Sequence, residues 1–89
     1  MASYMISESG KNGSVETTET GLEREVKKRV GKNDRQFIPY SSIQFVNHNR
    51  KSLKKDVVTV GVGGTTFEWK ISSGADNLVN EINAILAAR

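Results

Sequence analysis

The chain of 89 residues has no cysteine, a single histidine and a single proline. Without cysteine it has no disulfide framework, no thiolate metal site and no cysteine nucleophile. One histidine excludes a zinc site built on several histidines. We therefore expect no metal and no cofactor.

Long apolar runs are also missing. No run approaches the roughly 18 residues that a membrane span needs, and the N-terminus lacks the apolar stretch of a secretory signal. The length fits one domain with a small core. We expect a soluble cytoplasmic protein, with peripheral attachment to a membrane left open.

The formal net charge of +3 is unevenly distributed. Residues 1–23 carry one Lys against four Glu, a net charge of −3. Residues 24–55 carry ten basic groups against two acidic ones, a net charge of +8, and residues 56–89 carry two basic groups against four acidic ones, a net charge of −2. The basic character belongs to the middle of the chain, where it is either a binding surface or solubilising charge.

Short strands separated by turn residues follow a polar start. Residues 1–12 favour a flexible arm, with an extra edge strand through Tyr4–Ile6 as the alternative, and residues 13–89 form the domain. Alternation and turn residues predict strands over 14–19, 22–30, 35–38 and 43–48, with a tight turn at Thr20-Gly21 and a bend at Pro39.

The last two strands predict their own register. If Gly63-Gly64 is a two-residue hairpin turn, Val58 faces Trp69 and Val60 faces Phe67 across the pair. Opposed residues share a face, so one face becomes apolar and the other polar. A one-residue slip would place Phe67 and Trp69 in water, so the register should be well specified.

An amphipathic helix ends the chain, with Ser73 as the expected N-cap. Apolar residues recur at helical spacing from Ala75 to Leu86. Five or six antiparallel strands followed by one helix predict an α+β fold, in which the helix covers the apolar face that carries Phe67 and Trp69.

The segment Phe37-Ile38-Pro39-Tyr40-Ser41-Ser42-Ile43 resembles the "IPxSxI" segment of bacterial pleckstrin-homology-like (PH-like) domains. Thr18–Leu22 upstream, and the Gly63-Gly64 turn, the Phe67-Glu68-Trp69 strand and the helix downstream, follow in that family's order. The resemblance covers about residues 13–88. It implies a split barrel of six or seven antiparallel strands capped by one C-terminal helix, with the seventh strand supplied by residues 2–7 or missing. It also implies a non-catalytic role.

Catalytic motifs find no support in the sequence. Gly61-Val62-Gly63-Gly64 matches neither a dinucleotide fingerprint nor a phosphate loop, and a hairpin turn explains it. His48 can pair with an acid such as Asp56, but no nucleophile lies beside it, and a solvated or rim histidine is favoured. No carboxylate pair has an evident apolar setting that would shift its pKa.

Two basic clusters are the candidate site. If the strands form a simple meander, both clusters lie at one end of the sheet and make a rim for an anionic ligand. The nine members of this rim are Lys27, Lys28, Arg29, Lys32, Arg35, Arg50, Lys51, Lys54 and Lys55.

Three functions stay open, beside the alternative that the rim only solubilises the protein. The first is an interaction module for a protein partner or for self-association. The second is binding to anionic lipid head groups or a membrane surface through the rim. Nucleic-acid binding is the least favoured, because Phe67 and Trp69 are assigned to the core and leave no stacking platform.

Overall fold

Seven antiparallel strands and one helix make up the described structure, so the α+β class is confirmed. The computed structural model describes residues 2–50 and 56–88, and of Arg50 only the backbone. The elements are β1 Ser3–Glu8, β2 Lys11–Thr17, β3 Gly21–Val26, β4 Asp34–Pro39, a 3-10 turn at Tyr40–Ser42, β5 Ile43–Arg50, β6 Asp56–Val62, β7 Thr65–Ile71 and α1 Ala75–Ala88.

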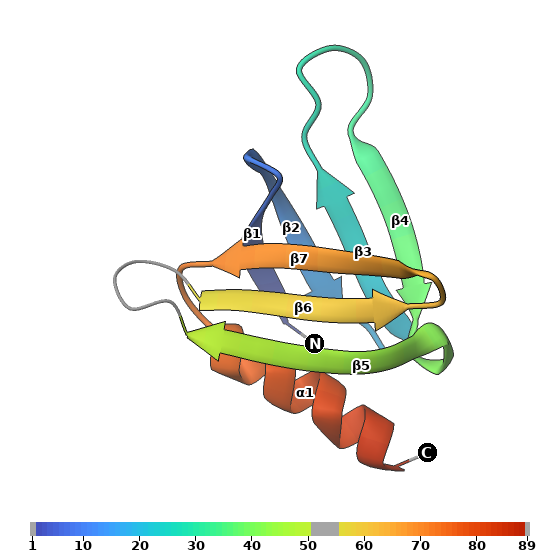
Figure 1. Ribbon diagram of the computed structural model, residues 1–89. Coiled ribbons are helices and arrows are strands. Elements are labelled where there is room, and N and C mark those ends of the chain that lie inside the picture. The colour runs from blue at the N-terminus through green and yellow to red at the C-terminus, as the bar shows by residue number, and fades with distance from the viewer. Residues whose placement is uncertain (1, 51–55, 89) are drawn as a thin grey trace.

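The strands form one sheet in the order β4-β3-β2-β1-β7-β6-β5. The sheet is not closed, since β4 and β5 are its two edges. Strands β5, β6 and β7 run across the direction of β1–β4, and α1 lies along the free side of β5 (Figure 1). The helix therefore covers the β5 edge, and the β4 edge lies at the far end of the strand order.

Strand β1 lies at the centre of the sheet, between β2 and β7. The flexible arm expected for residues 1–12 is therefore wrong. The alternative strand through Tyr4–Ile6, which residues 2–7 were to supply as the seventh strand, is present, but it is central and not at an edge. Ser9 and Gly10 take positive φ values of 52° and 81°, which suit the two-residue turn that joins Glu8 to Lys11. The turn pairs β1 with β2, and the short alternation of Tyr4 and Ile6 then reaches the core.

The β6–β7 hairpin has the predicted register. Val58 faces Trp69, Val60 faces Phe67 and Val62 faces Thr65. Trp69 is 0% exposed and belongs to the same apolar cluster as the buried helix residues Ala75, Leu78, Val79 and Ile82, while Phe67 is half-buried against this cluster. The helix and the apolar face of the hairpin therefore share one core, with α1 packed against β5 and β6.

Several predicted boundaries are wrong, including both ends of the strand predicted over 14–19, which runs from Lys11 to Thr17. Strand β3 ends at Val26, four residues early, because the Lys27-Lys28-Arg29 run has nothing to bury, and Val30 is 86% exposed. The helix N-cap is Gly74, not Ser73, since the Gly74 carbonyl accepts the first helical hydrogen bond, from Leu78 N–H at 3.0 Å. The Tyr4 hydroxyl donates to the Glu81 carboxylate and ties the helix to β1. Burial, reinforced by Glu81, raises the pKa of Tyr4 to about 12.

A tight turn joins β2 to β3 as predicted, but Gly21 does not supply the positive φ that was expected of it. Thr18 closes the turn: its backbone N–H donates to Gly21 C=O at 2.9 Å, and its hydroxyl accepts from Gly21 N–H at 3.1 Å and donates to Gly21 C=O at 2.8 Å. Gly21 begins β3 and is buried there, where an added Cβ would lie 2.4 Å from the Ile38 carbonyl oxygen. At Gly61 of β6, an added Cβ would lie 2.1 Å from the ring of Phe45.

We expect substitution of these two glycines by alanine to destabilise the protein to different extents. Gly21→Ala should lower the free energy of unfolding by about 3 kcal/mol, because backbone atoms of β4 cannot move aside. Gly61→Ala should cost about 1 kcal/mol, because the half-exposed Phe45 ring can swing away. Urea unfolding of both variants measures the difference.

A double variant supplies the control. Phe45→Ala should cancel most of the cost of Gly61→Ala, giving a favourable coupling energy in a double-mutant cycle. The corresponding Phe37→Ala change should not rescue Gly21→Ala, although the Phe37 ring also lies near that position. If both glycine variants lowered the free energy of unfolding equally, this would contradict the distinction between backbone crowding at Gly21 and side-chain crowding at Gly61.

Candidate functional site

The first basic cluster lies on the connection between β3 and β4, which extends beyond the rest of the sheet (Figure 1). Lys27, Lys28, Arg29 and Lys32 on this connection are all exposed. Arg35 belongs to β4 instead, where its Nε lies 3.4 Å from a Glu25 carboxylate oxygen. Four of the five predicted cations therefore share one projecting segment, which we call the basic connection (residues 27–33).

The second basic cluster falls mostly on residues that the structure does not describe. Arg50 ends β5, and Lys51, Lys54 and Lys55 lie outside the described residues. The meander from which a common rim was predicted is wrong, since β4 and β5 do not neighbour each other but are opposite edges of the sheet. A rim of all nine cations stays a prediction.

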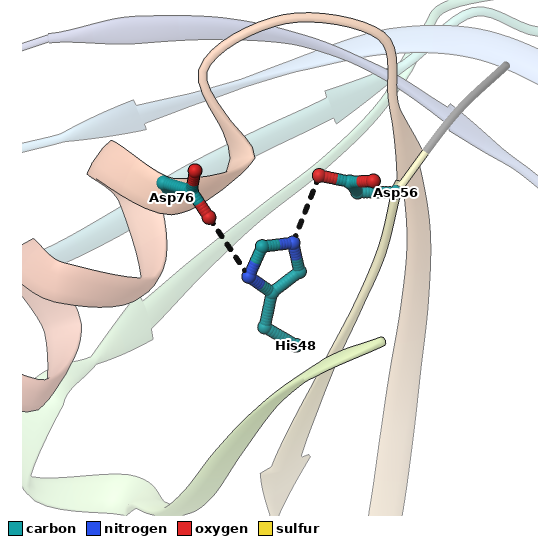
Figure 2. A group of neighbouring side chains, drawn as sticks. All are labelled: His48, Asp56 and Asp76. Carbon is teal, nitrogen blue, oxygen red and sulfur yellow. Dashed lines mark hydrogen bonds and ion pairs between the residues drawn. The ribbon is translucent and has the colours of Figure 1, made fainter. Parts of the chain in front are cut away.

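His48 of β5 brings two carboxylates together (Figure 2). Its Nε2 lies 2.9 Å from Asp56 Oδ2 in β6, and its Nδ1 lies 3.1 Å from Asp76 Oδ1 in the first turn of α1. The pairing of His48 with Asp56 is confirmed. The side chain is 15% exposed and lies on the edge strand β5, so of the expected solvated or rim histidine only the solvated alternative is wrong.

The chemistry of this cluster follows from the position of the ring between the carboxylates. One donor atom from each of the three residues lies within 4.8 Å of the others, and imidazole and carboxylate are zinc ligands. Both ring nitrogens already contact carboxylates, however, so an ion held by all three residues would require one contact to open. As arranged, the cluster is a clamp that holds the start of α1 to β5 and β6.

A buried charge network crosses the centre of the sheet. Arg24 of β3 is 5% exposed, and its Nε donates to Glu8 Oε1 at 2.8 Å while a second nitrogen contacts Glu8 Oε2. Glu8 also accepts from Trp69 Nε1–H at 2.8 Å, and Arg24 reaches Asp34 at 3.3 Å. The Arg24 guanidinium lies 5.2 Å from the centre of the Phe67 ring, within cation–π range. The network connects β1, β3, β4 and β7.

Sequence reasoning missed this network. The only signal was the alternation Leu22, Arg24, Val26, which places a cation on an apolar face. The hydrogen bonds from Arg24 lower the pKa of Glu8, although burial opposes this shift. The sequence-based expectation concerned only carboxylate pairs in an apolar setting, so it did not anticipate the shift that Arg24 causes at Glu8.

No protein-family model, curated protein or solved structure matches this chain. In the described ranges, the helical segments lack the length and apolar character needed to cross a bilayer. Function must therefore be inferred from the side chains described above.

Because Glu8 is paired with Arg24, we expect the stability of the folded protein to fall at acid pH. A folded-state pKa below the unfolded value gives stability that is present above the unfolded pKa, near 4.5, and is lost as the pH falls through the folded value. Glu8→Gln should cost about 2 kcal/mol at neutral pH, because it leaves Arg24 with Asp34 alone. The difference in free energy of unfolding between the variant and wild type should become smaller as the pH falls below 4.5. Urea unfolding at a series of pH values measures this difference.

Glu68→Gln is the matched control, because Glu68 is exposed on β7. Its free energy of unfolding should stay within about 0.5 kcal/mol of wild type at each pH. A Glu8→Gln penalty that does not change with pH would contradict the role of the Glu8 charge.

Proposed function

We propose that the protein is a non-catalytic PH-like interaction module whose basic connection binds an acidic surface on a protein partner. The split-barrel form of the fold is part of this proposal. It is supported by the strand order with β4 and β5 as edges, by the crossing of β5–β7 over β1–β4, and by a single C-terminal helix (Figure 1). The resemblance of Ile38–Ile43 to the PH-like segment points the same way.

The basic connection is the observation that carries the proposal. In the described part of the chain, Lys28, Arg29 and Lys32 form no ion pair, although the structure has five ion pairs elsewhere. Solvated cations gathered on one projecting segment attract an acidic surface and speed its encounter with the protein. Val30 between them adds an apolar contact once water is displaced.

The non-catalytic character is supported by how the charged groups are used. The Arg24 guanidinium is occupied by Glu8 and Asp34, and both ring nitrogens of His48 face carboxylates instead of a hydroxyl. A general base must reach the proton that it removes. These groups are engaged in holding strands and helix together.

An anionic membrane surface is the second candidate, favoured by the position of Val30. An exposed aliphatic side chain flanked by cations resembles the surfaces that insert shallowly among acidic head groups. Each cation near such a surface contributes about 1 kcal/mol. Lipid binding and acidic-protein binding therefore differ in how strongly they depend on Val30.

The test compares two variants against two probes. The probes are a Glu-rich peptide and vesicles of phosphatidylcholine with or without phosphatidylserine. The variant Lys28→Glu, Arg29→Glu, Lys32→Glu should weaken peptide binding at least about tenfold, since each exposed pair contributes up to about 1 kcal/mol. Val30→Ser should change peptide binding less than about threefold.

Each outcome selects one function. Peptide binding lost with the cations supports the interaction module. Binding only to phosphatidylserine vesicles, weakened by both variants, supports the membrane candidate instead. An intact wild type that binds neither probe would reject both.

A further inference from the structure

The outer face of β1–β4 carries two rows of side chains that the strand register lines up. In the first row, Ser3 faces Glu16, Glu16 faces Glu23 and Glu23 faces Phe37. The second row runs through Met5, Ser14, Glu25 and Arg35 in the same way. Residues directly opposite each other lie on one face, so each row is a line of neighbours.

The two rows differ in how their charges are satisfied. In the second row Glu25 has Arg35 at 3.4 Å and accepts a hydrogen bond from Asn33 at 2.8 Å. In the first row, Glu16 and Glu23 are directly opposed like charges, and within the described residues neither forms an ion pair. Like charges directly opposed on neighbouring strands destabilise a sheet, and a cation placed between them removes that cost.

Next to this carboxylate pair is an exposed aromatic ring. Phe37 is 47% exposed, and together with Glu16, Glu23 and Arg35 it lines a hollow of about 340 Å³. A Lys or Arg side chain in this hollow would meet two carboxylates and could lie against the Phe37 ring, where cation–π attraction adds to the charge. The hollow therefore suits a cationic side chain carried on a protein.

We propose that the occupant is a second copy of this chain, whose basic connection docks into the hollow. The donor side has unpaired cations around an exposed Val30, and the acceptor side has unpaired carboxylates beside an exposed Phe37. Both surfaces belong to the same chain and are complementary in charge and in apolar content. This inference rests on the proposed function and names the partner of the basic connection.

The contact must be between molecules. Glu23 lies three residues before Val26, where β3 ends and the basic connection begins, which along the strand is about 10 Å, and the row of Glu25 and Arg35 lies between. The rigid sheet thus separates the cations of one chain from its own carboxylate pair. Docking of one surface onto a different surface of a second copy is a head-to-tail contact.

Complementary charge reversal tests the contact by sedimentation velocity. An acceptor variant carries Glu16→Lys and Glu23→Lys, and a donor variant carries Lys28→Glu, Arg29→Glu and Lys32→Glu. Wild type should self-associate at low salt and dissociate as salt shortens the Debye length to about 8 Å or less. Each variant alone should associate at least about tenfold more weakly than wild type.

An equimolar mixture of the two variants should restore association. The basic connection of the acceptor variant and the outer face of the donor variant are both unaltered, so one contact of the wild-type kind remains. Glu68→Lys, at an exposed position of β7, is the matched control and should associate like wild type. Thermal unfolding confirms that each variant is folded.

The outcomes separate the two proposals. A wild type that stays monomeric at low salt and high concentration overturns the self-association, as does an acceptor variant that associates normally or a mixture that does not recover. The acceptor variant keeps its basic connection, so it should still bind the Glu-rich peptide. If wild type binds the Glu-rich peptide but does not self-associate, this inference alone is rejected. If wild type does not bind the peptide, the proposed function is rejected.

Discussion

The structure depends on the seam between its two groups of strands. In the described residues, β1 and β7 are joined by a single ladder pair, Ser7 with Lys70, whereas the other neighbouring strands share longer ladders. Glu8 of β1 accepts a hydrogen bond from Trp69 of β7 across this seam, and Arg24 of β3 holds the Glu8 carboxylate in place through a second hydrogen bond. A buried charge is tolerated here because every group around it forms a hydrogen bond or an ion pair. The network keeps the two groups of strands together while they cross at a steep angle.

Much of the fold could be predicted where local signals agree. The β6–β7 register followed from paired glycines and two matching alternations, and the helix followed from its apolar period. β1 was misjudged because its alternation is short and its turn uses Ser9, a residue without a strong preference for positive φ. Pairing between the first and the last strand depends on the whole sheet, and no local pattern encodes it.

The site was predicted less well, for a related reason. The segregation of charge along the sequence identified the basic connection, because a run of cations beside a turn glycine can be recognised as exposed without knowing the tertiary structure. Arg24 was counted in the net charge of +8 for residues 24–55, yet it is buried and paired with Glu8. The carboxylate pair of Glu16 and Glu23 and the contact of His48 with Asp76 exist only through register and helix placement. These features join residues from different elements, so a linear sequence does not display them.

The central position of β1 has a consequence for how the chain folds. Strand β1, the first of the seven strands in chain order, occupies the middle of the sheet, and one of its two neighbours, β7, is the last of the seven. Until β7 is present, β1 has an open side, and the sheet consists of two unconnected groups of strands. Contacts between residues so distant in sequence slow folding, because much of the chain must be ordered before they form. We therefore expect folding to be completed in one late step, in which β1 and β7 pair at the centre of the sheet.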